Sequence, residues 1–223
     1  MFIGHYAVGF ASKRFAPRAS LGVLIAAPIL LDILFPIFFV AGWESARIVP
    51  AATPFLRMSL DDYPWSHSLL AALLWAVLFA LVYWVLTRDR RTALVLWVGV
   101  MSHWVLDFIT HRPDMPLAPG GVARLGLDLW SSTIGTVVVE GLLFVAGVWL
   151  YVRATRAKDR RGRWGLWGMV AFLALFYLAD IFGPAPVDLK GFAWVALPLT
   201  VLLLAWAWWA DRHREANKVT GTA

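Results

Sequence analysis

The sequence contains no cysteine and little charge, with only 15% of its 223 residues charged. The absence of cysteine excludes disulfide bonds and thiolate metal ligands, which leaves histidine and carboxylate side chains as the strong ligands. The sequence also has no internal repeat, no glycine-rich phosphate loop and no low-complexity tract. Apolar residues are abundant instead: 61% of the chain is hydrophobic and the mean hydropathy is +0.70. This composition is typical of an integral membrane protein.

Six hydrophobic segments are long enough to cross a bilayer as helices, given a rise of about 1.5 Å per residue. They cover residues 20–42, 67–86, 92–111, 132–152, 165–183 and 191–210. The first segment follows basic residues, as in a signal peptide, but it carries Asp32 and has no convincing cleavage site, so we expect it to remain as a span. The predicted fold is all-α, a polytopic membrane helical bundle of about six transmembrane helices. We expect one domain over residues 1–212 and a flexible cytoplasmic tail over residues 213–223.

Basic residues concentrate in alternate loops, which predicts how the bundle is oriented. One set of segments contains Lys13, Arg14, Arg18, Arg88, Arg90, Arg91, Arg153, Arg156, Lys158, Arg160, Arg161, Arg163, Arg212, Arg214 and Lys218. The alternate segments contain only Arg47, Arg57, Arg112, Arg124 and Lys190. Because cytoplasmic loops carry the excess of basic residues, both termini are expected in the cytoplasm. Loops that face anionic lipid account for the net charge of +6, so we expect membrane lipids and no nucleic acid as partners.

The segment SHWVLDFITH places three ionisable residues inside a hydrophobic helix. His103, Asp107 and His111 recur every four residues, so their side chains fall within roughly 80° on one helix face. Each such group costs about 3 kcal/mol to insert, and several together usually line a site or a water-filled path. His103 and His111 are about 12 Å apart along the axis. Either one metal binds His103 and Asp107 while His111 acts elsewhere, or two ions are present; alternatively, these residues only hydrogen-bond between helices.

Further ionisable residues are expected in the outer half of the membrane. Counting the rise from the nearest basic residues puts Asp32 and His103 at a similar height, about 18 Å above the cytoplasmic side. His67, in the run DDYPWSHS, begins the second span at its outer end, where Ser66 is expected to cap the helix. Glu140 lies about two turns inside the fourth span. It can act as a catalytic base or join two helices by hydrogen bonds.

Prolines on both sides of Asp32 predict a local break in the first span. Pro28 and Pro36 each lack a backbone donor, so the helix can kink and free carbonyl groups beside Asp32. The N-terminal segment FIGHYAVGFA is apolar enough to form a short re-entrant helix, which would raise His5 by about 12 Å toward the membrane midplane. His5 could then join the other ionisable residues.

A set of histidine and aspartate side chains suits a divalent metal ion. Neutral imidazole and carboxylate are usual ligands of zinc, which we expect here, and they also accept manganese or iron. The predicted metal ligands are His5, Asp32, His67, His103, Asp107 and His111. Glu140 and Asp32 are the predicted catalytic residues, since a carboxylate can accept the proton of a metal-activated water.

Four segments, GHYAVGFA, LLDILFP, PWSHSLLA and SHWVLDFITHRPD, together resemble the YdjM-like membrane-bound metal-dependent hydrolases of the bacterial inner membrane. The motifs lie within residues 1–115, and the likeness continues through Glu140. The resemblance implies a metal-dependent hydrolase in the inner membrane. The site positions that it implies are His5, Asp32, His67, His103 and Asp107.

The predicted function is hydrolysis of a lipid or lipid-linked ester or phosphoester from the side of the outer leaflet. A proton-coupled or metal-ion transporter is the alternative, because it would use the same histidine and carboxylate groups. Against transport, the two halves of the chain show no repeat and the ionisable groups concentrate in residues 1–140. A third alternative is a scaffold in which a metal only joins helices.

Overall fold

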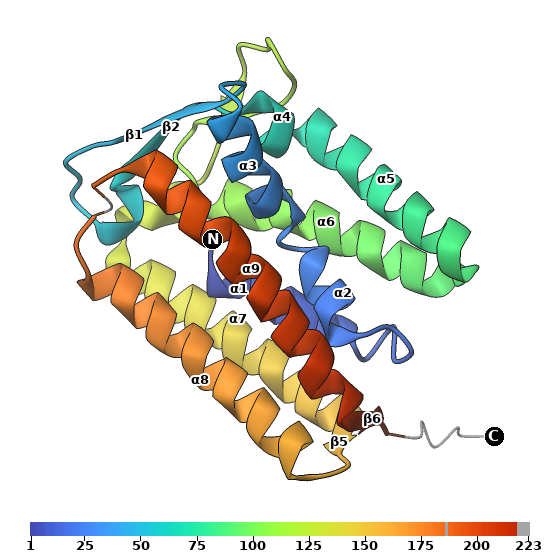
Figure 1. The fold of residues 1–223 in the computed structure, drawn as a ribbon. Helices are drawn as coiled ribbons and strands as arrows, with labels where there is room; N and C mark the ends of the chain where they lie inside the picture. Colours follow the sequence, from blue (N-terminus) through green and yellow to red (C-terminus); the bar gives the residue numbers. More distant parts are fainter. Residues whose placement is uncertain (186, 218–223) are drawn as a thin grey trace.

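The structure, a computed structural model, describes residues 1–185 and 187–217. Within these residues, five helices are long and apolar enough to cross a membrane (Figure 1). They are α5 (Leu69–Thr87), α6 (Arg90–Thr110), α7 (Thr133–Ala154), α8 (Arg160–Phe182) and α9 (Leu189–Arg212). The sequence predicted a span within a few residues of each, and the prediction of a helical membrane fold is confirmed.

Each long helix begins after a residue whose side chain accepts a hydrogen bond from the first turn. These residues are Ser68, Asp89, Ser132, Asp159 and Asp188. Such caps satisfy backbone N–H groups that have no partner within the helix, and they fix where each helix starts. The outward faces carry many exposed large apolar side chains, including Leu74 and Leu142, as expected for helices that contact lipid.

The first predicted span is not one continuous helix. The structure divides residues 20–42 into α2 (Leu21–Ala26) and α3 (Leu30–Val40), so five long helices and one broken pair replace the six expected spans. The break lies at Pro28, which has no backbone N–H to continue the helical hydrogen bonds. The Pro28 carbonyl oxygen accepts a hydrogen bond from His103 Nδ1 at 2.7 Å. A carbonyl freed beside Asp32, which the sequence predicted, is therefore present and reaches the site.

The N-terminal segment forms the expected short helix, α1 (Ile3–Ser12), whose side chains are mostly buried. It packs along α7 and also contacts α2 and α6. The contact with α7 is close because Gly147 has no side chain: a Cβ atom there would overlap the backbone of Ala7. This close approach positions α1 inside the bundle.

Two hydrophobic clusters form the core. The first joins α1, α2, α7, α8 and α9 through residues such as Phe10 and Leu173. The second joins α3, α5 and α6 through residues such as Leu31, Ala76 and Val100. Helices α1 and α6 thus belong to different clusters but contact each other. The candidate site lies where they meet.

Short strands close the two ends of the bundle. An antiparallel pair, β1 (Ser45–Ile48) and β2 (Met58–Asp62), lies at the opposite end from the antiparallel pair β5 (Thr155–Ala157) and β6 (Arg214–Ala216) (Figure 1). The remaining short elements are η1 (Pro54–Leu56), α4 (Pro64–His67), η2 (Leu129–Ser131) and the antiparallel strands β3 (Met115–Pro116) and β4 (Arg124–Leu125).

The predicted tail, residues 213–223, includes strand β6 of the β5–β6 pair. Residues Arg214–Ala216 pair with β5, and the backbone N–H of Asn217 donates to the Ala154 carbonyl at 2.9 Å. Residues 218–223 lie outside the described part of the chain.

Candidate metal centre

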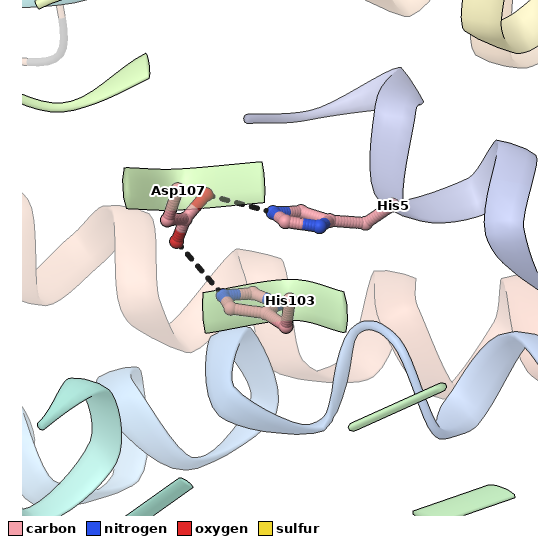
Figure 2. Close-up of side chains that lie close together, drawn as sticks. All are labelled: His5, His103 and Asp107. Carbon is pink, nitrogen blue, oxygen red and sulfur yellow. Dashed lines mark hydrogen bonds and ion pairs between the residues drawn. The ribbon is translucent and has the colours of Figure 1, made fainter. Parts of the chain in front are cut away.

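Helix α6 contributes the two central residues of the site, His103 and Asp107. His103 and Asp107 are one helical turn apart on its buried face, as the sequence spacing predicted. The Nε2 atom of His103 lies 3.0 Å from Oδ2 of Asp107 (Figure 2). Both side chains are buried, so the pair lies in the interior of the bundle.

Helix α1 contributes His5 from the other hydrophobic cluster. Its Nε2 atom lies 3.0 Å from Oδ1 of Asp107, and its ring stacks on that of His103 with centroids 3.8 Å apart (Figure 2). The same Oδ1 atom accepts a hydrogen bond from the amino group of Met1 at 2.6 Å. Asp107 therefore holds the start of α1 with one oxygen and faces His103 with the other.

His67 and Asp32 complete the cluster from α4 and α3. The Nε2 atoms of His67 and His103 are 3.2 Å apart. Oδ1 of Asp32 lies 3.7 Å from each of these nitrogens, and His67 Nε2 is also 3.7 Å from Oδ2 of Asp107. Asp32 differs from the other members in being accessible, since 48% of its side chain is exposed.

Two groups of side chains have the spacing of metal ligands. His5, His103 and Asp107 form one, and Asp32, His67 and His103 form the other, with the ligand atoms of each group all within 4.8 Å of one another. His103 belongs to both, so the groups are parts of one cluster. Five of the six predicted ligands are thus brought together.

His111, the sixth predicted ligand, lies at the edge of the cluster. It is the C-terminal cap of α6 rather than a member of its helical face. Its Nε2 atom is 3.8 Å from Oδ2 of Asp107, while Nδ1 lies 3.1 Å from Oδ1 of Asp114 and the ring packs on Trp130. The structure therefore places His111 beside the groups of possible ligands rather than within either of them.

The hydrogen bonds of His103 test whether a cation fits this cluster. Its Nδ1 atom faces the Pro28 carbonyl, which can only accept, so Nδ1 carries a proton. In a neutral imidazole, Nε2 then has a lone pair and no proton. It nevertheless lies 3.0 Å from the carboxylate of Asp107, which is also an acceptor. Two acceptors at this distance need positive charge between them, from added protons or from a metal ion. A buried set of imidazole and carboxylate acceptors with an Nδ1–H bonded to a carbonyl is the arrangement of protein zinc sites.

Glu140 contacts the site through the backbone of α1. Its Oε2 atom accepts hydrogen bonds from the backbone N–H groups of Phe2 at 2.9 Å and Gly4 at 3.3 Å. Of the two roles that the sequence left open, these contacts favour the hydrogen-bonding one. They hold the segment from which His5 reaches Asp107.

The residues that support His67 and His111 were not predicted from the sequence. Glu44, which is buried, accepts hydrogen bonds from Ser66, and the Ser66 hydroxyl lies 2.7 Å from His67 Nδ1. Ser66 was expected to cap the next helix, but Ser68 caps α5 instead. Asp114 could have been found from the sequence, because it follows His111 within the run HRPD. Glu44 could not, since it is distant from His67 along the chain and no motif surrounds it.

These features define a class: a helical membrane protein whose bundle encloses a cluster of histidine and aspartate side chains. The match to a family model is more specific, because the model described as YdjM inner membrane protein covers residues 2–187. The chain belongs to the YdjM inner membrane protein family. No match was found among curated proteins or among solved structures.

Proposed function

We propose that this protein is a membrane-embedded, metal-dependent hydrolase that acts on a lipid or a lipid-linked ester or phosphoester. One observation carries the proposal: imidazole nitrogens from α4 and α6 converge on carboxylates from α3 and α6 inside the bundle. Buried ionisable groups are costly in a membrane protein, so such a set is expected to serve a function.

The proposed ligands are His67, His103, Asp107 and Asp32, with His5 as a further donor beside Asp107. This donor set suits zinc, with manganese or iron as alternatives. A bound divalent cation would lower the pKa of a water toward neutrality and polarise the scissile ester or phosphoester group. The protein would hold the reacting groups in a space from which most solvent is excluded.

Asp32 is the better placed of the two predicted catalytic carboxylates. Its half-exposed side chain is the accessible part of the cluster, so substrate and water would meet it first. Oε2 of Glu140 is already occupied by two backbone N–H groups. We therefore assign proton acceptance to Asp32 and positioning of α1 to Glu140.

The surroundings of Asp32 support a lipid substrate. Asp32 is on α3, an apolar helix, and Phe35, one turn further along the same face, is partly exposed, so the accessible side of the cluster borders an apolar side chain. With both termini in the cytoplasm, as the loop charges predict, this side belongs to the outer half of the membrane.

Metal analysis of the purified protein tests the proposal. We expect wild type to retain zinc, or to bind it after reconstitution, and His103→Ala to lose most of it because two carboxylates lose their shared imidazole partner. The control is His213→Ala, which removes a histidine that pairs with Asp159 away from the cluster. Elemental analysis and zinc titration provide the measurement. A wild-type protein that binds no divalent cation contradicts the proposal.

Transport remains a second candidate because of the break between α2 and α3. Discontinuous helices at an ion site are a feature of many transporters. Reconstitution in vesicles separates the two functions: a hydrolase releases product from lipid esters or phosphoesters and carries no metal across. Zinc uptake that depends on His103, without any hydrolysis, would favour transport instead.

A further inference from the structure

A buried chain of hydrogen bonds supports one of the proposed ligands from outside the cluster. It runs from Glu44, in the segment before β1, through the hydroxyl of Ser66 to His67 at the end of α4. Glu44 is 4% exposed and Ser66 is fully buried. Buried polar groups are costly unless they are hydrogen-bonded, so a buried chain behind a proposed ligand is expected to have a role.

The direction of the protons follows from the chemistry of the three groups. The Glu44 carboxylate accepts three hydrogen bonds, from the backbone N–H groups of Trp65 at 2.9 Å and Ser66 at 2.7 Å and from the Ser66 hydroxyl at 2.7 Å. Because a carboxylate only accepts, the single hydroxyl proton of Ser66 points toward Glu44. The Ser66 oxygen then presents a lone pair to His67 Nδ1, 2.7 Å away.

The hydrogen bond at Nδ1 determines whether Nε2, the other nitrogen of the His67 ring, carries a proton. Nδ1 must donate a hydrogen bond to the Ser66 oxygen, so Nδ1 carries the proton and Nε2 of the neutral ring carries a lone pair. That atom faces His103 Nε2 at 3.2 Å and the carboxylates of Asp32 and Asp107 at 3.7 Å. The ring is thus held with its ligating nitrogen unprotonated and directed into the cluster.

We propose that Glu44 and Ser66 are positioning residues that fix the tautomer and orientation of His67 for metal binding. The proposal rests on the proposed metal-dependent function and adds two residues to it. Glu44 holds α4 through its backbone N–H groups and orients the Ser66 hydroxyl, which in turn selects the His67 tautomer. Hydrogen-bond partners of metal-bound histidines typically change metal affinity by about 10- to 100-fold when removed.

Two substitutions separate this role from simple support of the fold. In Glu44→Gln, the amide oxygen can still accept from the backbone of α4, but the amide NH₂ donates to the Ser66 oxygen. The Ser66 hydroxyl proton then turns to His67, whose ligating nitrogen becomes protonated. Ser66→Ala removes the hydroxyl altogether. Thr92→Ala is the matched control, because Thr92 donates its hydroxyl to the Asp89 carboxylate in the same local arrangement at the distant start of α6.

The test uses the full-length protein in detergent with Zn²⁺ and Co²⁺ as probes. We expect Glu44→Gln and Ser66→Ala to weaken Zn²⁺ binding by about 10- to 100-fold and to change the visible absorption spectrum of bound Co²⁺, while Thr92→Ala matches wild type. In a His67→Ala background, Ser66→Ala should cause no further loss, because its effect passes through His67. Thermal unfolding of the metal-free proteins, followed by tryptophan fluorescence, shows whether each variant folds.

The outcomes distinguish the two proposals. If wild type binds neither ion, the proposed function fails and the positioning role fails with it. If wild type binds but both variants bind equally well, only the positioning role is overturned. An equal loss from Ser66→Ala with and without His67 would also overturn it, because the effect would then be a general one on the fold.

Discussion

The buried carboxylate of Glu140, on α7, accepts hydrogen bonds from the backbone at the start of α1. Its hydrogen bonds to Phe2 and Gly4 satisfy two N–H groups at the start of a short helix, where no intrahelical partner exists. Because His5 follows directly, the position of its ring depends on this contact. Glu140 is thus important for the site even though it need not take part in a proton transfer.

Two substitutions at this residue distinguish positioning from catalysis. Glu140→Gln keeps an oxygen acceptor, so we expect near wild-type stability, metal affinity and hydrolysis. Glu140→Leu leaves two buried N–H groups without a partner, which costs about 1–3 kcal/mol for each group. Thermal unfolding and zinc titration provide the measurements. Loss of hydrolysis in Glu140→Gln with metal affinity retained would instead identify Glu140 as the base.

At the residue scale, the sequence predicted what helical periodicity determines. His103 and Asp107 were found because four-residue spacing places side chains on one helix face. Their convergence with Asp32 was anticipated only as a similar height in the membrane. Glu44 was not anticipated, because its contact with Ser66 depends on how a loop packs against a separate short helix.

At the scale of elements, the contact between α1 and α7 depends on a single glycine. A Cβ atom at Gly147 would overlap the backbone of Ala7, which cannot move without shifting α1. Gly141, on the same helix, has no neighbour near its Cβ position among the described residues. The two positions therefore form a matched pair for testing how closely these helices must approach.

We expect Gly147→Ala to destabilise the protein by about 1–3 kcal/mol, the usual range for overpacking. Gly141→Ala should leave stability unchanged or raise it by up to about 1 kcal/mol, because alanine favours the helix. Thermal unfolding of both variants provides the comparison, and zinc titration shows whether the shift of α1 reaches His5. Equal stabilities of the two variants would contradict the close packing described above.

The start of α8 has a pH-dependent cap. Asp159 accepts a hydrogen bond from the backbone N–H of Gly162 at 2.8 Å, and its other oxygen lies 2.8 Å from His213 Nδ1. These contacts hold the pKa of Asp159 below its ordinary value of 3.8. A carboxyl group with a lowered pKa in the folded state stabilises the protein above its unfolded pKa, and this stability is lost as pH falls through the folded pKa.

The difference in stability between wild type and Asp159→Asn should therefore shrink as the pH falls below about 4. Unfolding measured across this pH range in both proteins tests the expectation. A difference that persists in strong acid would show that the charge of Asp159 is not what stabilises the cap.

The broken first span shows the limit of prediction for elements. Hydrophobicity predicted one span over residues 20–42, and the prolines indicated a kink. The carbonyl oxygen of Pro28, at the break, accepts a tertiary hydrogen bond from His103 on α6. A partner so distant in the sequence leaves no pattern in the segment itself.

At the scale of the whole molecule, buried polar contacts hold the bundle at the end opposite the site. Lys13 donates to Asp211 at 2.6 Å, and Tyr151 donates to the other oxygen of the same carboxylate at 2.6 Å. The backbone N–H of Leu21 adds a third hydrogen bond at 3.2 Å. Asp211 thereby connects the end of α1, the start of α2, α7 and α9.

We expect Asp211→Asn to destabilise the protein by about 3–5 kcal/mol, because it leaves the buried ammonium group of Lys13 without its counter-charge. The control is Glu215→Gln, which breaks the exposed ion pair with Arg156 at the same end and should change stability by no more than about 1 kcal/mol. Thermal unfolding measures both. Similar effects from the two variants would show that burial of the Asp211 pair is unimportant.

The double contact of Asp107 would link the docking of the N-terminal helix to the binding of the proposed metal ion. One oxygen holds Met1 and His5, while the other faces His103. Two events that share one carboxyl group are thermodynamically reciprocal, so each changes the free energy of the other by the same amount. If the proposed ion binds Asp107, its capture would change how firmly the first helical turns are held, and the seating of Met1 would change the affinity for the ion by the same factor.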